Sequence, residues 1–402
     1  MEGSNRKIIR ITGVGFGNKG AEAMLLVAVE AIHNRLPGVE ILVQLRRKNF
    51  EQARAIGLTL LETTPSRAFW RRVMAALCWH KIHYKAGAVI DVGGYQFGDP
   101  WGAKSAKNKL ELVKQRIRAG ELVFFLPQAW GPFSTDGIGE SIREIVNTAT
   151  LSFARDKTSL RELHKLVGAD NSKVCFAHDI AWNFQGDDLS LGRQLIMNVA
   201  GAGKDNAMTV CLVPNRQVYK RCKGQGPDND YIVLLCNIIS HLSRRHNARL
   251  ILLEHQLSKD NPEERNDKTL CKYILSSLDS ALPVVHLDKT LSASQIKSVI
   301  GNCDLLLSSR YHALIAALSQ QIPAVAIGWS HKYDELMAEV GLGSNIIFSS
   351  MAKGEVLDQI DKVVEQMPQA REILASTVPV MKQSGRAAID KVLSIIADKF
   401  RE

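Results

Sequence analysis

The stretch that decides the fold of this chain runs from Leu305 to Lys332 and reads LLLSSRYHALIAALSQQIPAVAIGWSHK. An apolar run that ends at Ser308 and Ser309 predicts a buried strand, and the small residues from Ala313 to about Gln320 predict a helix. A second apolar run, Pro323 to Ile327, predicts the next strand. Strand, helix and strand in this order indicate a parallel α/β sheet.

Arg310, Tyr311 and His312 stand where that strand gives way to the helix. In an open α/β sheet, ligands bind at the carboxyl ends of the strands, and a helix N-terminus there favours an anion. Arg310 offers a planar fork to a carboxylate or phosphate, and His312 can move protons near neutral pH. The alternative is an arginine that only caps a strand end, with the histidine in the core.

The chain has 402 residues, of which 46% are hydrophobic, and this predicts two globular domains of about 200 residues each. Its seven cysteines are scattered without a C-x-x-C pair, which argues against a disulfide framework or a zinc site and for a reducing compartment. Since no signal-like or membrane-length apolar stretch is found, we expect a cytoplasmic protein.

Strand and helix periodicities alternate in two series, which predicts two doubly wound, Rossmann-like α/β domains that face a cleft. We expect an N-terminal domain over residues 1–185 and a C-terminal domain over residues 207–352. Residues 353–402 look helical and are expected to pack back on the N-terminal domain. The expected strands are residues 7–12, 40–45, 88–92, 122–126 and 151–153, then 208–213, 248–253, 283–286, 305–308 and 324–327.

The net charge of +10 is concentrated in two windows of the N-terminal half, Pro65–Lys85 and Lys104–Arg118. Such a field would attract an anionic substrate or a membrane surface. The first window also reads as an amphipathic helix, which could contact a membrane peripherally or could simply pack on a sheet. Because no nucleic-acid motif accompanies the charge, nucleic acid is not expected as a partner.

Polar residues also follow several other expected strands. The first strand leads into the glycine-rich turn GVGFGNKG at residues 13–20, which matches a dinucleotide fingerprint only weakly because no acid follows the second strand. Asp99, Gln128, Arg155 and Arg216 each stand in a loop just after a strand. Asp99 could equally begin a turn before Pro100, and Asp156 is expected to cap the helix after Arg155. Together these loops predict one interdomain cleft.

The segments GFGNKGAEAML, GGYQFGD, LPQAWGPF, ARDKTS and SSRYHALIAAL carry a resemblance. In order and spacing they resemble the polysaccharide pyruvyltransferase family over roughly residues 8–342. The resemblance implies a fold similar to B-type glycosyltransferases and transfer of the pyruvyl group of phosphoenolpyruvate to a saccharide. Ala21 stands where the family usually has an acid, with Glu22 adjacent, and Tyr95 replaces the last glycine of a usual triplet.

The resemblance implies phosphoenolpyruvate bound between the domains, without cofactor or metal. His312 and Asp99 are the expected catalytic residues. Arg310, Tyr311 and Arg216 are expected to bind phosphoenolpyruvate, with the two arginines on facing domains. The expected acceptor is a saccharide or lipid-linked saccharide of an exopolysaccharide pathway, which would place the enzyme at the inner face of the membrane. Candidates for cleft or acceptor contacts are Asn18, Glu22, Gln128 and Arg155.

Two alternatives remain at this point. One is a B-type glycosyltransferase that uses a nucleotide sugar, since an arginine and a histidine at a helix start would also suit a diphosphate. The other is a non-catalytic module that binds membranes or polymers through the basic region from Pro65 to Arg118.

Overall fold

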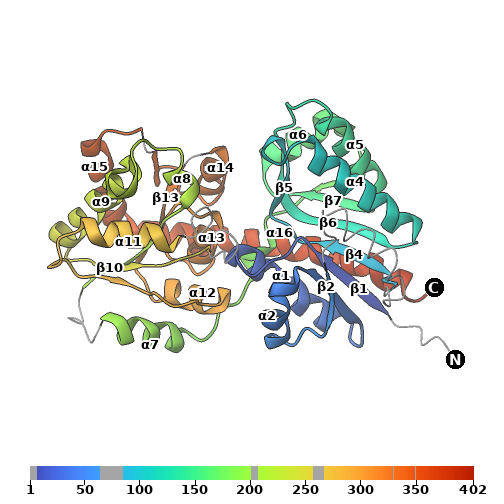
Figure 1. Cartoon of the computed structure of the whole chain (residues 1–402), viewed down its shortest axis with the longest axis horizontal. Helices are drawn as coiled ribbons and strands as arrows, with labels where there is room; N and C mark the ends of the chain where they lie inside the picture. Colours follow the sequence, from blue (N-terminus) through green and yellow to red (C-terminus); the bar gives the residue numbers. More distant parts are fainter. Residues whose placement is uncertain (1–6, 64–84, 201–206, 257–266, 329, 349) are drawn as a thin grey trace. The chain divides into compact units, whose positions relative to one another are not determined.

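The computed structural model describes residues 7–63, 85–200, 207–256, 267–328, 330–348 and 350–402. The chain divides into two compact units, and each is built on one parallel sheet (Figure 1). Unit 1 comprises Met1–Phe16, Met24–Ile180 and Ser384–Glu402, and unit 2 comprises Gly17–Ala23 and Ala181–Gln383. The predicted class, two Rossmann-like α/β domains, is confirmed.

The sheet of unit 1 has the strand order β3-β2-β1-β4-β6-β7-β8, and β5 pairs with β6 beside this path. Its strands are β1 (Ile8–Thr12), β2 (Glu40–Leu45), β3 (Leu60–Thr63), β4 (Ala88–Asp91), β5 (Tyr95–Phe97), β6 (Leu122–Trp130), β7 (Leu151–Ala154) and β8 (Val174–Phe176). The helices in this part of the chain are α1 (Lys19–Arg35), α2 (Phe50–Ala55), α4 (Ala103–Arg118), α5 (Ile138–Thr148) and α6 (Lys157–Val167).

The sheet of unit 2 has the order β11-β10-β9-β12-β13-β14. Its strands are β9 (Thr209–Val213), β10 (Arg249–Leu252), β11 (Val284–His286), β12 (Leu305–Ser308), β13 (Ala324–Gly328) and β14 (Ile346–Phe348). The helices are α7 (Leu189–Ala200), α8 (Arg216–Tyr219), α9 (Asp230–His246), α11 (Lys268–Ser277), α12 (Ala293–Gly301), α13 (Tyr311–Leu318), α14 (His331–Glu339), α15 (Lys353–Glu365) and α16 (Met367–Lys399), whose last part belongs to unit 1.

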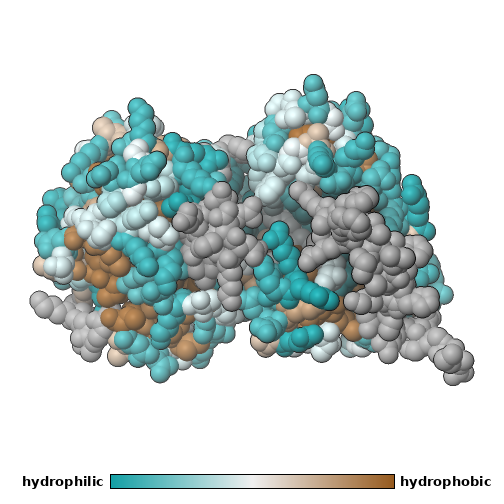
Figure 2. Space-filling model, in the orientation of Figure 1, coloured by the Kyte–Doolittle hydropathy of each residue, from teal (hydrophilic) through white to brown (hydrophobic). Residues whose placement is uncertain are grey.

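The sheet of unit 2 is covered on both faces, which explains why its strands read as unbroken apolar runs. Leu212, Leu250 and Leu307 are fully buried on the face where α9, α11 and α15 pack. Helices α7 and α12 lie on the other side of the sheet in Figure 1. Much of the visible surface is hydrophilic, and apolar side chains gather where α7 exposes Leu189 and Met197 (Figure 2).

Buried aromatic rings organise the core of unit 1 near the end of β6. The rings of Phe97 and Trp130 stack with centroids 4.4 Å apart, and Phe125 meets both edge to face. Asp156 caps α6 by accepting a hydrogen bond from the Ser159 N–H at 2.7 Å, which confirms the predicted cap. The rings and the cap fix the loops that follow β6 and β7.

Of the two basic windows, the structure describes the second in full and only the last residue of the first. Residues 65–84 of the first window, including the predicted amphipathic helix, lie outside the described residues. In the second window, Lys109, Lys114 and Arg116 form ion pairs within unit 1, whereas Lys104 and Lys107 are exposed. None of the helices in the described ranges has the length and hydrophobicity that crossing a bilayer requires.

Candidate active site

The candidate site lies in unit 2 at the carboxyl ends of β9 and β12, the two neighbouring strands where the strand order reverses direction. Such a reversal point leaves room for a ligand beyond the strand ends. Arg216 follows β9 and Arg310 follows β12, so both arginines belong to unit 2. The expectation that they stand on facing domains is therefore wrong, because both come from one sheet.

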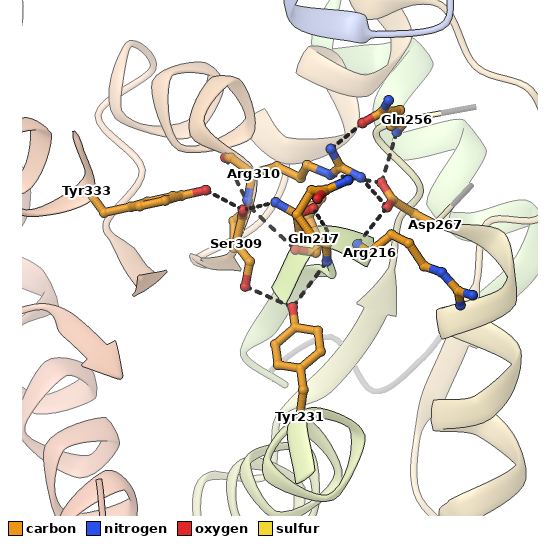
Figure 3. Close-up of polar contacts among 11 residues, drawn as sticks. Arg216, Gln217, Tyr231, Gln256, Asp267, Ser309, Arg310 and Tyr333 are labelled. Atoms are coloured by element: carbon orange, nitrogen blue, oxygen red, sulfur yellow. Dashed lines mark hydrogen bonds and ion pairs between the residues drawn. The ribbon is translucent and has the colours of Figure 1, made fainter. Parts of the chain in front are cut away.

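Ser309 is the centre of the hydrogen-bond network that shapes this edge (Figure 3). Its carbonyl oxygen accepts hydrogen bonds from Asn215 Nδ2 at 2.6 Å and from the Tyr333 hydroxyl at 2.6 Å. The Tyr231 hydroxyl lies 2.8 Å from Ser309 Oγ, and burial raises the pKa of this tyrosine. The loops after β9 and β12 are thus tied to each other and to α9, which holds the backbone of the site rigid.

Arg310 is already engaged by the protein. Its Nε donates to Asp267 Oδ2 at 3.1 Å, its Nη2 pairs with Asp267 Oδ1, and its Nη1 donates to Gln256 Oε1. Because Asp267 is fully buried, this two-pronged pair balances much of the positive charge of Arg310. Arg310 is held in place, and a ligand would share it with Asp267.

The guanidinium of Arg216 has different surroundings from that of Arg310. The backbone N–H of Arg216 lies 3.4 Å from Asp267 Oδ1, but its guanidinium points away from the Asp267–Arg310 pair (Figure 3). The guanidinium lies over the ring of Tyr219, 4.6 Å from its centroid. Within the described ranges, the buried Nε and Nη1 atoms have no hydrogen-bond partner. A guanidinium with unused donors at this edge of the sheet is suited to an anion.

His312 lies in the first turn of α13, and the ring of Tyr311 meets it edge to face with centroids 5.4 Å apart. The imidazole packs directly against Gly20, where an added Cβ would collide with the ring. Both residues line a small cavity of about 20 Å³, which Lys19, His255 and Lys297 also reach. The glycine-rich turn therefore places its backbone beside the predicted proton-transfer residue.

His255, which follows β10 and is buried, was not predicted as a site residue. Burial lowers the pKa of His255 well below its usual value, and the positive charges of Arg310 and Lys19 lower it further. His255 is therefore neutral near neutral pH. The only signal in the sequence was its place just after a predicted strand.

Asn18 and Glu22 also belong to unit 2. Asn18 Oδ1 accepts from the Gly20 N–H at 3.0 Å, and its backbone forms a bridge with Gln256, the residue that binds Arg310. Glu22 is buried, lies 2.8 Å from Lys19 Nζ and accepts from the Ala293 N–H, the first of α12, at 2.9 Å. In this structure Glu22 is committed to those partners.

The other predicted residues, Asp99, Gln128 and Arg155, lie in unit 1. Asp99 accepts hydrogen bonds from the hydroxyl and N–H of Ser134 and from the Thr135 N–H, and these lower its pKa. Arg155 donates to the buried Asp179 at 2.9 Å.

Gln128 is fully buried, and its Oε1 accepts from Gln96 Nε2 at 3.2 Å. Gln96 in turn donates to Asp91, a buried carboxylate at the end of β4 that pairs with Lys109 Nζ at 2.6 Å. Thr12, at the end of β1, donates to Asp91 at 2.8 Å. This network was not predicted from the sequence, although Asp91 lies within the predicted strand over residues 88–92.

Residues 18–331 match the family model for polysaccharide pyruvyl transferase. The chain belongs to this family. It is 23% identical over 320 residues to the amylovoran biosynthesis protein AmsJ of Erwinia amylovora, a match that covers 77% of this chain and 73% of AmsJ. The resemblance predicted from the motifs is thereby confirmed, and the chain is a transferase rather than a non-catalytic binding module.

Solved structures with the same fold include an epimerase and a glycosyltransferase. The UDP-GlcNAc 2-epimerase of Neisseria meningitidis, bound to UDP-GlcNAc, is 12% identical with a TM-score of 0.61, covering 96% of this chain and all of that one. A glycosyltransferase from Rickettsia africae is 10% identical with a TM-score of 0.60, covering 99% and 100%. At this identity the likeness establishes the fold alone.

Proposed function

We propose that this enzyme transfers the pyruvyl group of phosphoenolpyruvate to two hydroxyls of a saccharide and releases inorganic phosphate. The observation that carries the proposal is that the carboxyl end of the unit 2 sheet holds two suitable side chains. They are Arg216, with unused donors among the described residues, and His312, in the first turn of α13. The family membership supports pyruvyl transfer, and the motif resemblance supports phosphoenolpyruvate as its donor.

The donor is a small anion with a carboxylate and a phosphate, so its binding requires cations with free hydrogen-bond donors. Arg216 meets that requirement more directly than Arg310, whose fork already binds Asp267. We therefore assign Arg216 to direct contact with the donor. Arg310, which Asp267 holds in place, shares its guanidinium with the donor, and Tyr311 stands on the same turn.

Ketal formation balances without a further reagent. A proton is added to the methylene carbon of phosphoenolpyruvate, the first hydroxyl attacks the cationic carbon, and the second hydroxyl displaces phosphate. The two hydroxyls lose two protons, which end on the new methyl group and on the phosphate. His312 is the general acid and base for these transfers, since imidazole titrates near neutral pH. Asp99 stays a candidate for acceptor contact.

The deciding experiment measures phosphate release from phosphoenolpyruvate with a panel of free and lipid-linked saccharides, combined with mass spectrometry of the acceptors. We expect phosphate release that depends on the acceptor, and a pyruvylated product. His312→Ala should reduce turnover by about a hundredfold or more. His33→Ala, at an exposed histidine of α1, is the matched control and should remain active.

Melting curves separate this function from glycosyl transfer with a nucleotide sugar, because a ligand that binds only the native state raises the melting temperature. We expect phosphoenolpyruvate to stabilise the protein and nucleotide sugars to have no effect. Stabilisation by a nucleotide sugar alone would contradict the proposal and favour glycosyl transfer. Full turnover in His312→Ala would contradict the role of that residue.

A further inference from the structure

A second cluster of chemically capable side chains lies in unit 2 among residues that the candidate site does not use. His241 and His246 stand near the C-terminal end of α9, and Asp361 stands on α15. The Nε2 atoms of the two histidines lie 2.7 and 2.6 Å from the same carboxylate oxygen, Asp361 Oδ1. One donor atom from each of the three residues lies within 4.8 Å of the other two.

The two helices that supply the cluster are held together independently of it. Ile239 and Leu242 of α9 pack in the same buried cluster as Ile360 of α15. The side chains of His241, His246 and Asp361 are 17–18% exposed, so the cluster is preorganised yet open to solvent on one side. A solute can therefore enter without unfolding a helix.

Two imidazole nitrogens and one carboxylate oxygen form a donor set typical of zinc and related divalent ions. In a tetrahedral zinc site, metal–ligand distances of about 2.0–2.1 Å place the ligand atoms about 3.3 Å apart. The nitrogen–oxygen distances observed here are 2.7 and 2.6 Å, so a small outward movement of each ring would admit the ion. The side open to solvent leaves a position for water.

Arg245 completes the arrangement. Its Nε lies 2.9 Å from Asp361 Oδ2, the second oxygen of the carboxylate. A hydrogen bond to the second oxygen orients a carboxylate that binds a metal through the first. The Arg245 side chain is 63% exposed, so it can adjust when an ion enters.

We propose that His241, His246 and Asp361 bind one divalent ion of the zinc class, which fastens α15 to the C-terminal end of α9. This site is separate from the candidate active site, and the proposed pyruvyl transfer does not depend on the ion. The site was not predicted from the sequence, because the H-x4-H pair of His241 and His246 has no accompanying cysteine pair and Asp361 lies far along the chain from it.

The test uses the full chain without a polyhistidine tag, treated with a chelator and then titrated with Zn²⁺ by calorimetry. We expect saturable binding of one ion per chain and a rise in melting temperature of a few degrees. Titration with Co²⁺ should give the visible absorption bands of a tetrahedral nitrogen and oxygen site. Mg²⁺ should have no effect, since it prefers oxygen ligands in octahedral geometry.

His241→Gln is the informative variant because its amide can still donate to Asp361 while the imidazole ligand is lost. It should weaken Zn²⁺ binding at least tenfold, as should Asp361→Asn, whereas the control His33→Ala should bind as the unmodified protein does. If Asp361→Asn fails to fold, the comparison of His241→Gln with the unmodified protein tests the proposal by itself. Absence of saturable Zn²⁺ binding, or equal binding in His241→Gln, would overturn the proposal and leave a hydrogen-bonded helix contact.

Discussion

The imidazole of His312 and the backbone of Gly20 are in direct contact, so the site admits no side chain at residue 20. Gly15, in the same glycine-rich turn, has open space where a Cβ would stand. The two glycines thus differ in their surroundings, although both fit one sequence pattern.

This contact predicts that Gly20→Ala displaces the His312 ring and lowers the rate of phosphate release by about tenfold to a hundredfold. Gly15→Ala, the matched control, should behave like the unmodified enzyme. Steady-state assays of both variants check the prediction. Equal rates in the two variants would show that the position of His312 does not depend on Gly20.

Arg216 is predicted to supply the main anion contact. Replacement by Met removes a charged donor whose hydrogen bonds contribute about 1.5–3 kcal/mol, so phosphoenolpyruvate should bind about tenfold to a hundredfold more weakly. Arg221→Met is the control, because Arg221 is exposed and its Nη1 donates to the Gln217 carbonyl oxygen. Calorimetric titration of both variants gives the comparison, and unchanged binding in Arg216→Met would shift the role to Arg310.

The ion pair of Lys109 with the buried Asp91 is predicted to support unit 1. The Lys109 charge and hydrogen bonds outweigh the effect of burial and hold the pKa of Asp91 below its usual value. Lys109→Met leaves a buried carboxylate without its cation and should lower the free energy of unfolding by about 3–5 kcal/mol. Lys107→Met, at an exposed lysine of the same helix, should change it by less than about 0.5 kcal/mol. Urea denaturation measures the free energy of unfolding of both variants. A similar decrease in the two would contradict the prediction.

Lys297 is predicted to make stability depend on pH. Burial, with a smaller effect from Lys382, lowers the pKa of Lys297 to about 7, although its Nζ donates to Ser319 Oγ at 2.9 Å. In the unfolded chain a lysine titrates near pH ~10.4, so between these values the unfolded state binds one more proton and stability rises with pH. The destabilising effect of Lys297 is full below about pH 7 and fades as the pH rises toward ~10.4.

Lys297→Met should therefore gain stability relative to the unmodified protein at pH 7, and the gain should shrink as the pH rises, with a slope of up to about 1.4 kcal/mol per pH unit. Lys220→Met, at an exposed lysine, should show no such trend. Denaturation curves of both variants and of the unmodified protein over this pH range test the prediction. A stability difference that is the same at every pH would disprove the titration of Lys297 in this window.

The sequence predicted the longer central strands of both sheets, because strands covered on two faces must be apolar throughout. The strands β3, β5, β8 and β14 were not predicted. β3, β8 and β14 each stand at the edge of a sheet and include half-buried or exposed residues, so they lack the full burial of a central strand. The predicted strand over residues 122–126 continues to Trp130, past Pro127.

Some residues of the candidate site could be identified from the sequence and others could not. Arg216, Arg310 and His312 were identified because each stands in a loop or helix start directly after a strand. Asp267, which balances the charge of Arg310, and His255, which lines the cavity beside His312, were missed. Their importance comes from contacts between loops that are distant in sequence, and no local pattern marks such contacts.

The sequence by itself determined the fold class, the family and the position of Arg310 and His312 at the end of a buried strand. These properties follow from local periodicity and from motifs within short stretches. Only the tertiary structure decided that Asp267 balances Arg310, that Arg216 keeps unused donors among the described residues, and that Gly20 lies against His312. Charge balance and steric contact depend on distances of a few ångströms between segments, and the order of strands in the folded sheet sets those distances.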